Sequence, residues 1–568
     1  MKRLVVAIVV VVAGLAGWAG WAAPAFAHAV LQSTDPAAGA VLTKSPASVV
    51  LHFDEDVEIQ FGSVRVYSAA GRRVDRGLAY HPNGDHHSVA TKVAGNLAEG
   101  GYAVTWRVIS ADSHPVHGAF TFQVGAGGAA AAQASRTEAA RLLAAGAGSG
   151  TVGVLFGIVR FLGFATLFLL VGGAAFVAGI WPAGASERRA RQLLWGALIA
   201  SVLTTALAIC LQGPYGGGLP LSEMINPSVV SDVLRTRFGE VYLARLIVLV
   251  AVAAPLLARL LRPDRRPGWW TPVAIVTAAA LLITPGLAGH AGSGSLVALA
   301  IPFDLIHVAG AAVWVGGLAM LATVVLTRRP EEPSLRPVLV RYSQTALAAV
   351  AAIAVTGGFA AWRQVGSWSA VTSTTFGRLL LAKTIIFAAL VMVAAFSQQL
   401  LHGDLTLPFG LSRRPRAGRR GQWRVRLRLS VLAELGLVAA ILAVTAGLVN
   451  AQPARSALAL PYSTEVHAGP NVLVDVIVDP AKAGPVAVHI YTLTPDGAQL
   501  DVPGVRAYFS LPSAQIRDLP VPLQKAGPGH FLNTAFQVPL RGTWTLQLTA
   551  QTTNTGQVYA DPITVHMR

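Results

Sequence analysis

The sequence predicts a multidomain membrane protein with an N-terminal β-sandwich or β-barrel, a bundle of eight transmembrane α-helices and a C-terminal β-sandwich. Of the 568 residues, 53% are hydrophobic and only 12% are charged, which is too apolar for a soluble protein of this length. Eight apolar runs in the middle of the chain each approach the roughly 20 residues that a helix needs to span a bilayer. On both sides of them, short alternating runs between glycine and proline turns are typical of β-strands.

The charged and sulfur-containing residues narrow the possible functions. The formal net charge of +17 is concentrated in loops between apolar runs, where the positive-inside rule explains it better than nucleic-acid binding does. The chain has no Walker A motif, so we expect the lipid bilayer as a partner and neither a nucleotide nor a nucleic acid. One cysteine, Cys210, and five methionines leave no disulfide framework and little soft-ligand chemistry.

Residues 1–27 have the form of a secretory signal peptide, in which Lys2 and Arg3 precede an apolar run and a small-x-small end at Ala27. Cleavage after Ala27 would leave His28 as the first residue of the mature protein. A terminal histidine offers its α-amine and its imidazole together, and this pair suits the preference of Cu(II) for nitrogen ligands. An uncleaved anchor helix is the alternative interpretation.

Residues 28–125 show the alternation expected of a small β-sandwich or Greek-key barrel. Ahead of the last predicted strand, Asp112 and His114 are two residues apart, so an extended backbone would point both side chains to one face. Together they offer two ligands to a metal, which is too few to close a site. His117 follows, either as a solvated loop residue or as an extra ligand. The predicted strands include residues 49–53, 63–67, 102–106 and 119–124.

Several motifs of this region resemble the CopC family of periplasmic copper-binding proteins. They are His28-Ala29, Asp35-Pro36, Tyr102-x-Val104-x-Trp106-x-Val108 and the stretch Ser110-Ala-Asp-Ser-His-Pro-Val. The resemblance implies that one Cu(II) is held by the amine and imidazole of His28 together with Asp112 and His114. The family usually has glycine where Ser113 stands. The domain has no methionine, so we expect that it lacks the methionine-rich Cu(I) site of some members.

Residues 126–151, rich in alanine and glycine, are expected to form a flexible linker, and residues 152–450 to form the membrane domain. Every second loop between the apolar runs is rich in arginine, and such loops face the cytoplasm. We therefore expect the N-terminal and C-terminal domains on the extracytoplasmic side of the plasma membrane. The predicted spans lie near residues 153–180, 192–213, 240–261, 270–289, 299–326, 338–361, 378–399 and 428–449.

Three ionisable residues lie in or at the ends of these spans, where polar groups are costly. His290 closes the fourth span at its outer end, and Asp304 and His307 share one face of the fifth because they are three residues apart. We predict that the three form a path for copper through the membrane. Hydrogen bonding between helices is the alternative role for Asp304 and His307.

The membrane region also resembles a known family. The motifs are Phe238-Gly-x-x-Tyr-Leu-x-Arg245, Asp304-Leu-x-His307 with the following Trp314-x-Gly-Gly-Leu318, and Thr375-Phe-Gly-Arg-Leu-Leu-Leu-x-Lys383. Over residues 150–450 they resemble the CopD family of copper-resistance membrane proteins. The order of the two resemblances along the chain is that of a CopC–CopD fusion.

Residues 451–568 return to the alternation of β-strands, and we expect a second exported β-sandwich. Gly527-x-Gly-His-Phe531 followed by Gly542-Thr-Trp544 resembles the YtkA or FixH type of domain. The predicted strands include residues 471–478, 486–491 and 543–548. The histidines of this region are too dispersed in sequence to predict a site; they are His467, His489, His530 and His566.

These observations predict a copper-handling protein that is not an enzyme. The exported domain would capture Cu(II) and transfer it to the bundle for transport, with uptake the expected direction, in copper homeostasis or resistance. One alternative is a haem-binding redox protein, in which His290 and His307 would be the paired axial ligands. Another is a copper sensor or scaffold in which the bundle is only an anchor.

Overall fold

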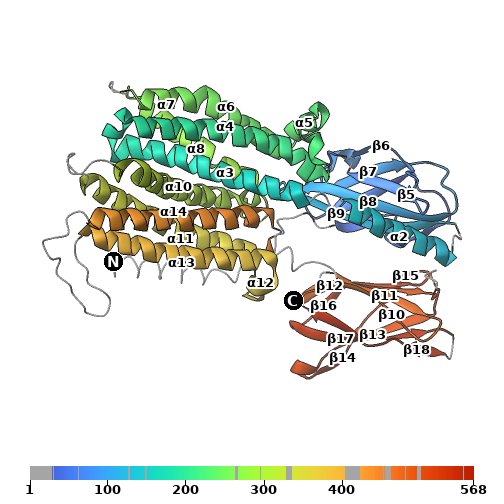
Figure 1. Ribbon diagram of the computed structural model, residues 1–568. Helices are drawn as coiled ribbons and strands as arrows, with labels where there is room; N and C mark the ends of the chain where they lie inside the picture. The colour runs from blue at the N-terminus through green and yellow to red at the C-terminus, as the bar shows by residue number, and fades with distance from the viewer. Residues whose placement is uncertain are drawn as a thin grey trace.

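The computed structural model describes two β-sheet domains at one end of a long helical bundle (Figure 1). The predicted signal peptide and His28 lie outside the described residues. Those residues are 29, 31–61, 63–125, 128–146, 150–262, 267–294, 296–327, 336–366, 368–402, 422–451, 453–454, 462–479, 481–495, 500–553 and 556–567.

The N-terminal domain is a sandwich of two sheets, as predicted. One has the strand order β1-β3-β7-β6, and the other has β2-β9-β8-β4 with β5 also paired to β8. Alternate residues of β3 (Val49, Leu51 and Phe53) are buried between the sheets, where Phe53 meets the Trp106 ring edge-on. The strands are β1 (Leu31–Asp35), β2 (Val41–Leu42), β3 (Ser48–Phe53), β4 (Val57–Glu58), β5 (Val64–Ser68), β6 (Asp75–Tyr80), β7 (Ser88–Val93), β8 (Gly100–Ser110) and β9 (Pro115–Val124), with the turn η2 (Pro82–Gly84).

The stretch expected to be a flexible linker contains a helix, α2 (Gly128–Gly146), which packs against β8 and β9. Gly101 of β8 makes this contact possible, because a Cβ there would lie 2.2 Å from the carbonyl oxygen of Ala131. The expectation of a flexible tether was therefore wrong over this helix. Alanine has the highest helix propensity of all residues, and a surface that accepts the helix stabilises it.

Within the described residues, eight helical segments are long and apolar enough to span a membrane, at the places predicted from the sequence. Their helices are α3 (Gly150–Ala175) with η3 (Phe176–Ile180), α4 (Arg188–Gly217), α6 (Arg237–Ile247) with η6 (Val248–Ala253) and α7 (Ala254–Leu260), α8 (Trp270–Leu282) with α9 (Thr284–Leu287), α10 (Val297–Met320) with η8 (Leu321–Val325), α11 (Arg336–Val365), α13 (Thr375–His402) and α14 (Gln422–Asn450). Shorter helical segments are η4 (Pro182–Ser186), η5 (Leu221–Ile225), α5 (Pro227–Leu234), η7 (His290–Gly292) and α12 (Trp368–Ser373).

Helices α3 and α10 cross at the centre of the bundle through small residues. A Cβ on Gly172 of α3 would lie 1.7 Å from the carbonyl oxygen of Ala312, and one on Gly316 of α10 would lie 2.6 Å from the backbone of Gly172. The two backbones are in contact, which is the usual way in which helices associate in lipid. This crossing fixes the position of α10, the helix that carries Asp304 and His307.

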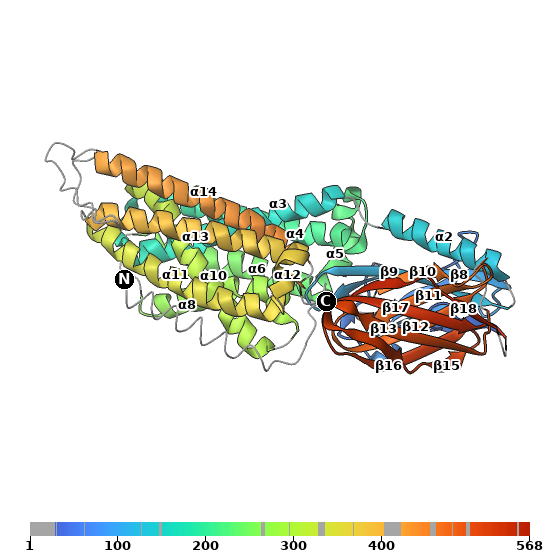
Figure 2. The same cartoon turned by 90° about the horizontal axis from the view of Figure 1, so that it is seen from below.

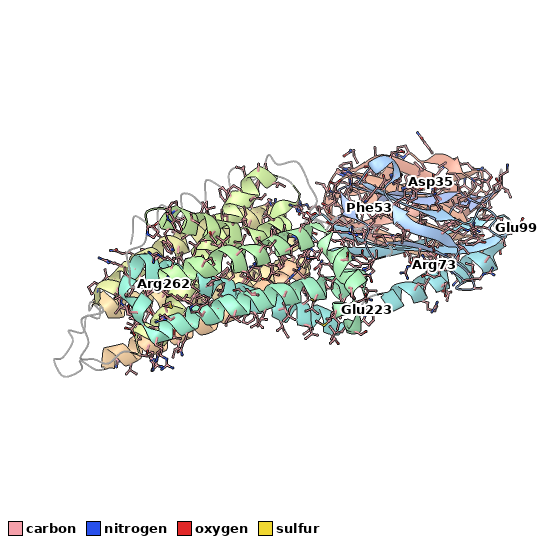
Figure 3. The ribbon with its side chains drawn as sticks, turned by 90° about the horizontal axis from the view of Figure 1, so that it is seen from above. Asp35, Phe53, Arg73, Glu99, Glu223 and Arg262 are labelled. Carbon is pink, nitrogen blue, oxygen red and sulfur yellow. The ribbon has the colours of Figure 1, made fainter. Side chains whose placement is uncertain are left out.

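Alternate loops lie at opposite ends of the bundle. Figure 3 shows Glu223, in the loop between α4 and α6, toward the end that meets the β domains, and Arg262, after α7, toward the other end. An even number of spans returns the chain to its starting side, so both β domains lie at the same end.

The C-terminal region consists of two five-stranded sheets that share a core around Phe509 and Trp544. It lies beside the N-terminal domain (Figure 2). One sheet has the order β10-β11-β12-β16-β15, and the other has β14-β13-β17-β18 with β19 also paired to β17. The strands are β10 (Tyr462–His467), β11 (Leu473–Asp479), β12 (Gly484–Leu493), β13 (Gly504–Leu511), β14 (Ile516–Val521), β15 (Gln524–Gly527), β16 (His530–Val538), β17 (Gly542–Gln551), β18 (Gln557–Tyr559) and β19 (Ile563–Met567), with the turn η9 (Pro512–Ala514).

Candidate metal centre and membrane cavity

Asp112 and His114 lie in the tight turn between β8 and β9. The backbone N–H of Ser113 donates to the carbonyl of Ser110 at 2.8 Å, and the N–H of Ser110 donates to the carbonyl of His114 at 2.9 Å. Ser113 has a φ of 69°, in the left-handed region where glycine is favoured, which agrees with the glycine usual in the family resembled. The extended backbone expected for this stretch was therefore wrong. The turn itself brings the two side chains together.

The Asp112 carboxylate is completely buried and held by its own turn. The Ser110 hydroxyl donates to Oδ1, and the backbone N–H of His114 donates to the same oxygen at 3.3 Å. His114 Nδ1 lies 3.1 Å from Oδ1. The carboxylate and imidazole are thus fixed before any ligand arrives, which lowers the entropy cost of binding one.

A third potential ligand comes from the helical bundle. His290 lies in η7, directly after the fourth membrane segment, and its Nδ1 is 2.9 Å from Asp112 Oδ2. The rings of His114 and His290 stack with their centroids 4.9 Å apart and their planes 10° apart. One ligand atom from each of Asp112, His114 and His290 lies within 4.8 Å of the other two, and all three residues are buried.

The hydrogen bond that Nε2 of His114 makes determines whether Nδ1 of the same ring carries a hydrogen or a lone pair. His114 Nε2 bonds to the carbonyl oxygen of Val449, at the end of α14. A carbonyl oxygen only accepts, so Nε2 carries the hydrogen, and in neutral His114 the Nδ1 lone pair faces the Asp112 carboxylate. Two acceptors facing each other are stabilised by a cation between them. Two imidazoles and one carboxylate are a donor set that suits Cu(II).

His290 is positioned from within the bundle. The guanidinium of Arg363, on α11, donates to the carbonyl of His290 and, at 3.2 Å, to that of Ser293. The Phe376 ring, at the start of α13, meets the His290 ring edge-on at 6.3 Å. Arg363 therefore holds the turn that presents the imidazole to the N-terminal domain.

Further contacts dock the N-terminal domain on the bundle. Arg107 of β8 donates to the carbonyls of Gly216, at 2.5 Å, and of Tyr215, at 3.2 Å. The backbone N–H of Arg237 donates to Glu58 Oε1 at 2.7 Å. Burial raises the pKa of Glu58 to about 7, although the Arg237 N–H and charge oppose the shift. These contacts surround the buried cluster and fix its geometry.

A second carboxyl group lies close to Asp112. Glu55 accepts a hydrogen bond from the N–H of Ala111 at 3.3 Å. Burial and the negative charge of Asp112 raise the pKa of Glu55 to about 8.

The predicted exported site has two further members, His28 and His117. His28 lies outside the described residues, and its role as a ligand stays a prediction; the following Ala29 is buried in the core of the N-terminal domain. His117 lies on β9 opposite Arg107, where its side chain is exposed. It does not belong to the group of Asp112, His114 and His290.

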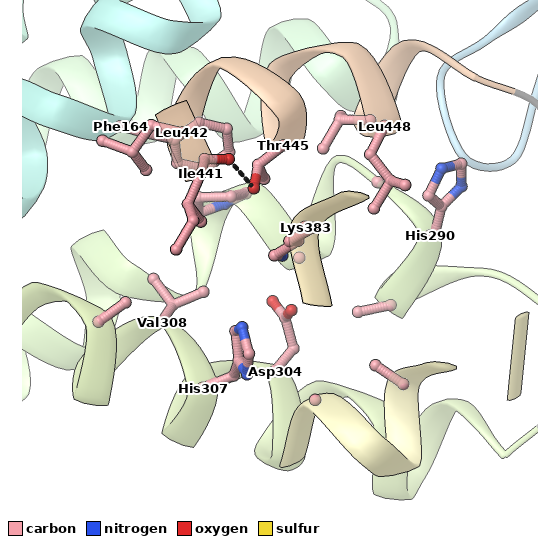
Figure 4. A pocket seen from close by; sticks show the side chains of 18 of the residues that line it. Phe164, His290, Asp304, His307, Val308, Lys383, Ile441, Leu442, Thr445 and Leu448 are labelled. Carbon is pink, nitrogen blue, oxygen red and sulfur yellow. Dashed lines mark hydrogen bonds between the residues drawn. The ribbon is translucent and has the colours of Figure 1, made fainter. Parts of the chain in front are cut away.

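A cavity of 760 Å³ begins at His290 and continues between the helices of the bundle. Its lining is mostly apolar, and it contains both other residues of the predicted path, Asp304 and His307 (Figure 4). His307 Nδ1 lies 3.0 Å from the Thr356 hydroxyl, and a Cβ on Gly286 would lie 2.4 Å from Asp304 Oδ2. The cavity thus connects the interdomain cluster with the ionisable pair on α10.

Basic side chains also line this cavity, and each interacts with another group. The Arg160 guanidinium bonds to the Asn450 side chain, and that of Arg245 lies over the Tyr242 ring at 5.3 Å. Lys383 and Asp304 attract one another electrostatically. Of these partners only Asp304 carries a negative charge, so the charge that is balanced within the cavity is that of Lys383.

Comparison with known families accounts for this arrangement. Residues 31–125 match the profile of the CopC domain, residues 150–298 that of the copper resistance protein D-like N-terminal domain, and residues 336–448 that of copper resistance protein D. The chain belongs to the CopC–CopD family of copper-resistance proteins. Proteins of these families act in copper binding, resistance and transport.

Two relatives agree with this assignment, and one solved structure is similar to part of the chain. Copper transport protein CutJ of Bacillus subtilis (strain 168) is 27% identical over 379 residues, which are 65% of this chain and 67% of CutJ. Copper resistance protein C of Pseudomonas syringae pv. tomato is 33% identical over 103 residues, which are 17% of this chain and 81% of that protein. The crystal structure of CopC from Methylosinus trichosporium OB3b is 30% identical, with a TM-score of 0.16, and covers 17% of this chain and 93% of its own.

Sequence reasoning had placed His290 with the membrane path and not with the ligands of the CopC domain. It is 178 residues from Asp112, so no local spacing could have linked them. Arg363 and the Val449 carbonyl were also missed, because their roles arise only when the CopC domain docks on the CopD bundle.

Proposed function

We propose that the CopC domain captures Cu(II) with His28, Asp112 and His114, and that His290 of the CopD bundle then joins these ligands and passes the ion into the membrane cavity. The observation that carries this proposal is the convergence of Asp112, His114 and His290 in one buried cluster between the two domains. The His114 lone pair that faces the Asp112 carboxylate supports a cation between them.

The continuation of the path follows from the position of His290, which both touches Asp112 and lines the cavity. Asp304 and His307 supply the next oxygen and nitrogen ligands within the cavity. Lys383 balances the negative charge of Asp304 when copper is absent. When copper binds to Asp304, the charge of the ion repels the Lys383 ammonium and takes over this role. The proposed path therefore consists of copper ligands, together with Lys383 as a counter-charge that copper can replace.

The direction of transport rests on orientation. Arg262 lies toward the end of the bundle away from the β domains (Figure 3), and the sequence places the other arginine-rich loops on the same side of the membrane. We therefore place the β domains outside the plasma membrane and the basic loops in the cytoplasm. Capture by an outer domain followed by passage through the cavity that His290 and Asp304 line corresponds to copper uptake.

The test uses the full chain in lipid vesicles, with Cu(II) binding measured by EPR and copper accumulation measured by metal analysis. His290→Phe keeps an aromatic ring against His114 but removes the ligand nitrogens. We expect it to retain Cu(II) capture, with affinity lowered at least about tenfold, corresponding to about 1.4 kcal/mol, and to lose transport. His566→Phe, at an exposed site in the C-terminal domain, is the matched control and should behave as wild type.

Two further comparisons separate capture from passage. One extra residue ahead of His28 should change the EPR spectrum, since the free α-amine would be lost. Asp304→Asn with His307→Ala should bind Cu(II) normally and fail to transport it. Wild-type transport by either His290→Phe or this double variant would contradict the path. Cu(II) binding without any transport by the wild-type chain would favour a sensor in which the bundle is an anchor.

A further inference from the structure

The sheet β10-β11-β12-β16-β15 is the one of the C-terminal region that lies nearer the CopC domain (Figure 1). The register of its strands places several polar side chains in one row. In the register of the strands, Glu465 on β10 pairs with Asp475 on β11, Asp475 with Tyr491 on β12, and Tyr491 with His530 on β16. Residues directly opposite each other across strands have their Cβ atoms about 5 Å apart. The four side chains therefore form one continuous row.

His489, two residues before Tyr491, lies on the same face and brings a second imidazole to this row. Its Nδ1 is 3.2 Å from Nε2 of His530, and the two rings are parallel within 15°. The Tyr491 ring stacks on the His530 ring at 4.3 Å. Two histidines that are 41 residues apart in sequence thus meet through one nitrogen each, in a hydrogen bond that a metal ion would replace.

The spacing of these nitrogens suits a metal ion. An ion about 2.0 Å from each of two nitrogens 3.2 Å apart would see them at an angle of roughly 105°. This angle lies between those of tetragonal and tetrahedral ligand pairs. The Tyr491 phenol and the Asp475 carboxylate, which interact with each other electrostatically, are oxygen donors in the same row.

The two rings lie in partly buried surroundings that also contain acidic groups. Burial lowers the pKa of His489, and burial together with the neighbouring His489 lowers the pKa of His530 to about 4. Burial and the charge of Glu465 raise the pKa of Asp475 to about 6. Arg136 of α2 pairs with Glu465 at 2.7 Å, so the row lies where the C-terminal domain meets the helix that covers the CopC domain.

We propose that His489 and His530 form a second extracytoplasmic copper site, in which the two imidazoles are the protein ligands. Among divalent first-row metals, nitrogen and oxygen ligands bind Cu(II) most strongly, so Cu(II) is the ion assigned. The site lies in the C-terminal domain, apart from the cluster of Asp112, His114 and His290. It would hold an additional ion beside the capture site, and it does not depend on the proposed transport path.

The test uses the full chain in detergent with His114→Ala in every sample, so that the capture site is weakened throughout. Each sample is loaded with Cu(II), passed through gel filtration, and analysed for copper per chain and for nitrogen couplings by EPR. Adding His489→Phe and His530→Phe keeps the aromatic stack while removing the ligand nitrogens, and we expect bound copper to fall by one ion per chain. Adding His566→Phe instead, in the other sheet, should leave the copper content unchanged.

Two outcomes would overturn the proposal. One is an equal copper content in the His489→Phe/His530→Phe and His566→Phe samples. The other is an EPR difference spectrum without nitrogen couplings. Because replacing both rings could disturb folding, His489→Phe alone is measured together with its thermal unfolding; it should lose the tightly bound ion while its unfolding temperature matches that of the control.

Discussion

Three glycines that line the membrane cavity allow the proposed path to be tested by adding single methyl groups. A Cβ on Gly286 would lie 2.4 Å from Asp304 Oδ2, one on Gly357 would lie 3.2 Å from Cε1 of His307, and one on Gly358 would meet nothing within 4 Å. Ordinary carbon–oxygen contact begins at about 3.4 Å, so Gly286→Ala moves the Asp304 carboxylate by about 1 Å. Gly358→Ala is the control in the same cavity.

The size of the effect follows from the side-chain geometry. Displacing a carboxylate from its rotamer costs about 0.5–1.5 kcal/mol, which would weaken an ion bound through Asp304 roughly two- to tenfold. Gly357→Ala requires the His307 ring to move by only a few tenths of an ångström, so it should weaken copper binding less than Gly286→Ala does. Cu(II) binding at the CopC domain should not change in any of the three variants.

The assay is copper accumulation in vesicles at several copper concentrations, with protein insertion measured in parallel. We expect the half-saturating concentration to rise in the order Gly358→Ala, Gly357→Ala, Gly286→Ala. If Gly286→Ala transported copper like Gly358→Ala while remaining folded and inserted, Asp304 would not be a ligand on the path, and the reasoning would be refuted.

Two further predictions concern stability. The pKa of Glu58 is about 7 when docked and 4.5 when free, so docking of the CopC domain should be strongest below pH 4.5 and should weaken as the pH rises to 7, by roughly 3 kcal/mol at most. Glu58→Gln should reduce this dependence in limited proteolysis between pH 5 and 8, leaving the part that comes from Glu55, and an unchanged pH profile would contradict the assignment. Gly172→Ala should destabilise the α3–α10 crossing by about 1–3 kcal/mol, measured by thermal unfolding in detergent. The control is Gly196→Ala, whose Cβ would meet nothing within 4 Å and which should be neutral or slightly stabilising. Equal unfolding temperatures of the two variants would show that the crossing tolerates a methyl group.

The eight spans and most strands could be predicted from the sequence because they depend on local patterns. A run of about 20 apolar residues spans a bilayer whatever its neighbours are, and alternation along β3 reflects its two faces. The alanine-rich stretch of α2 was wrongly predicted as a tether because its structure depends on a tertiary contact and not on a local pattern. Its composition permits either a tether or a helix, and the surface of β8 and β9 that receives it decides in favour of the helix.

The candidate site shows the same division. Asp112 and His114 could be found from their spacing, although their proximity depends on a left-handed turn at Ser113 and not on an extended strand. The third member, His290, could be recognised only as a polar residue at a membrane boundary. His489 and His530 were judged too dispersed to form a site, yet the pairing of β12 with β16 places their nitrogens 3.2 Å apart.

The sequence by itself determined which segments enter the membrane, which form sheets, and which side chains can bind copper, because hydrophobicity, periodicity and ligand chemistry belong to the residues. Only the tertiary structure decided which of these side chains meet. The contact between Asp112 and His290 depends on docking the CopC domain against the CopD bundle, through Arg107, Glu58 and the end of α14. Docking sums many weak contacts between distant parts of the chain, and no single stretch of sequence encodes that sum.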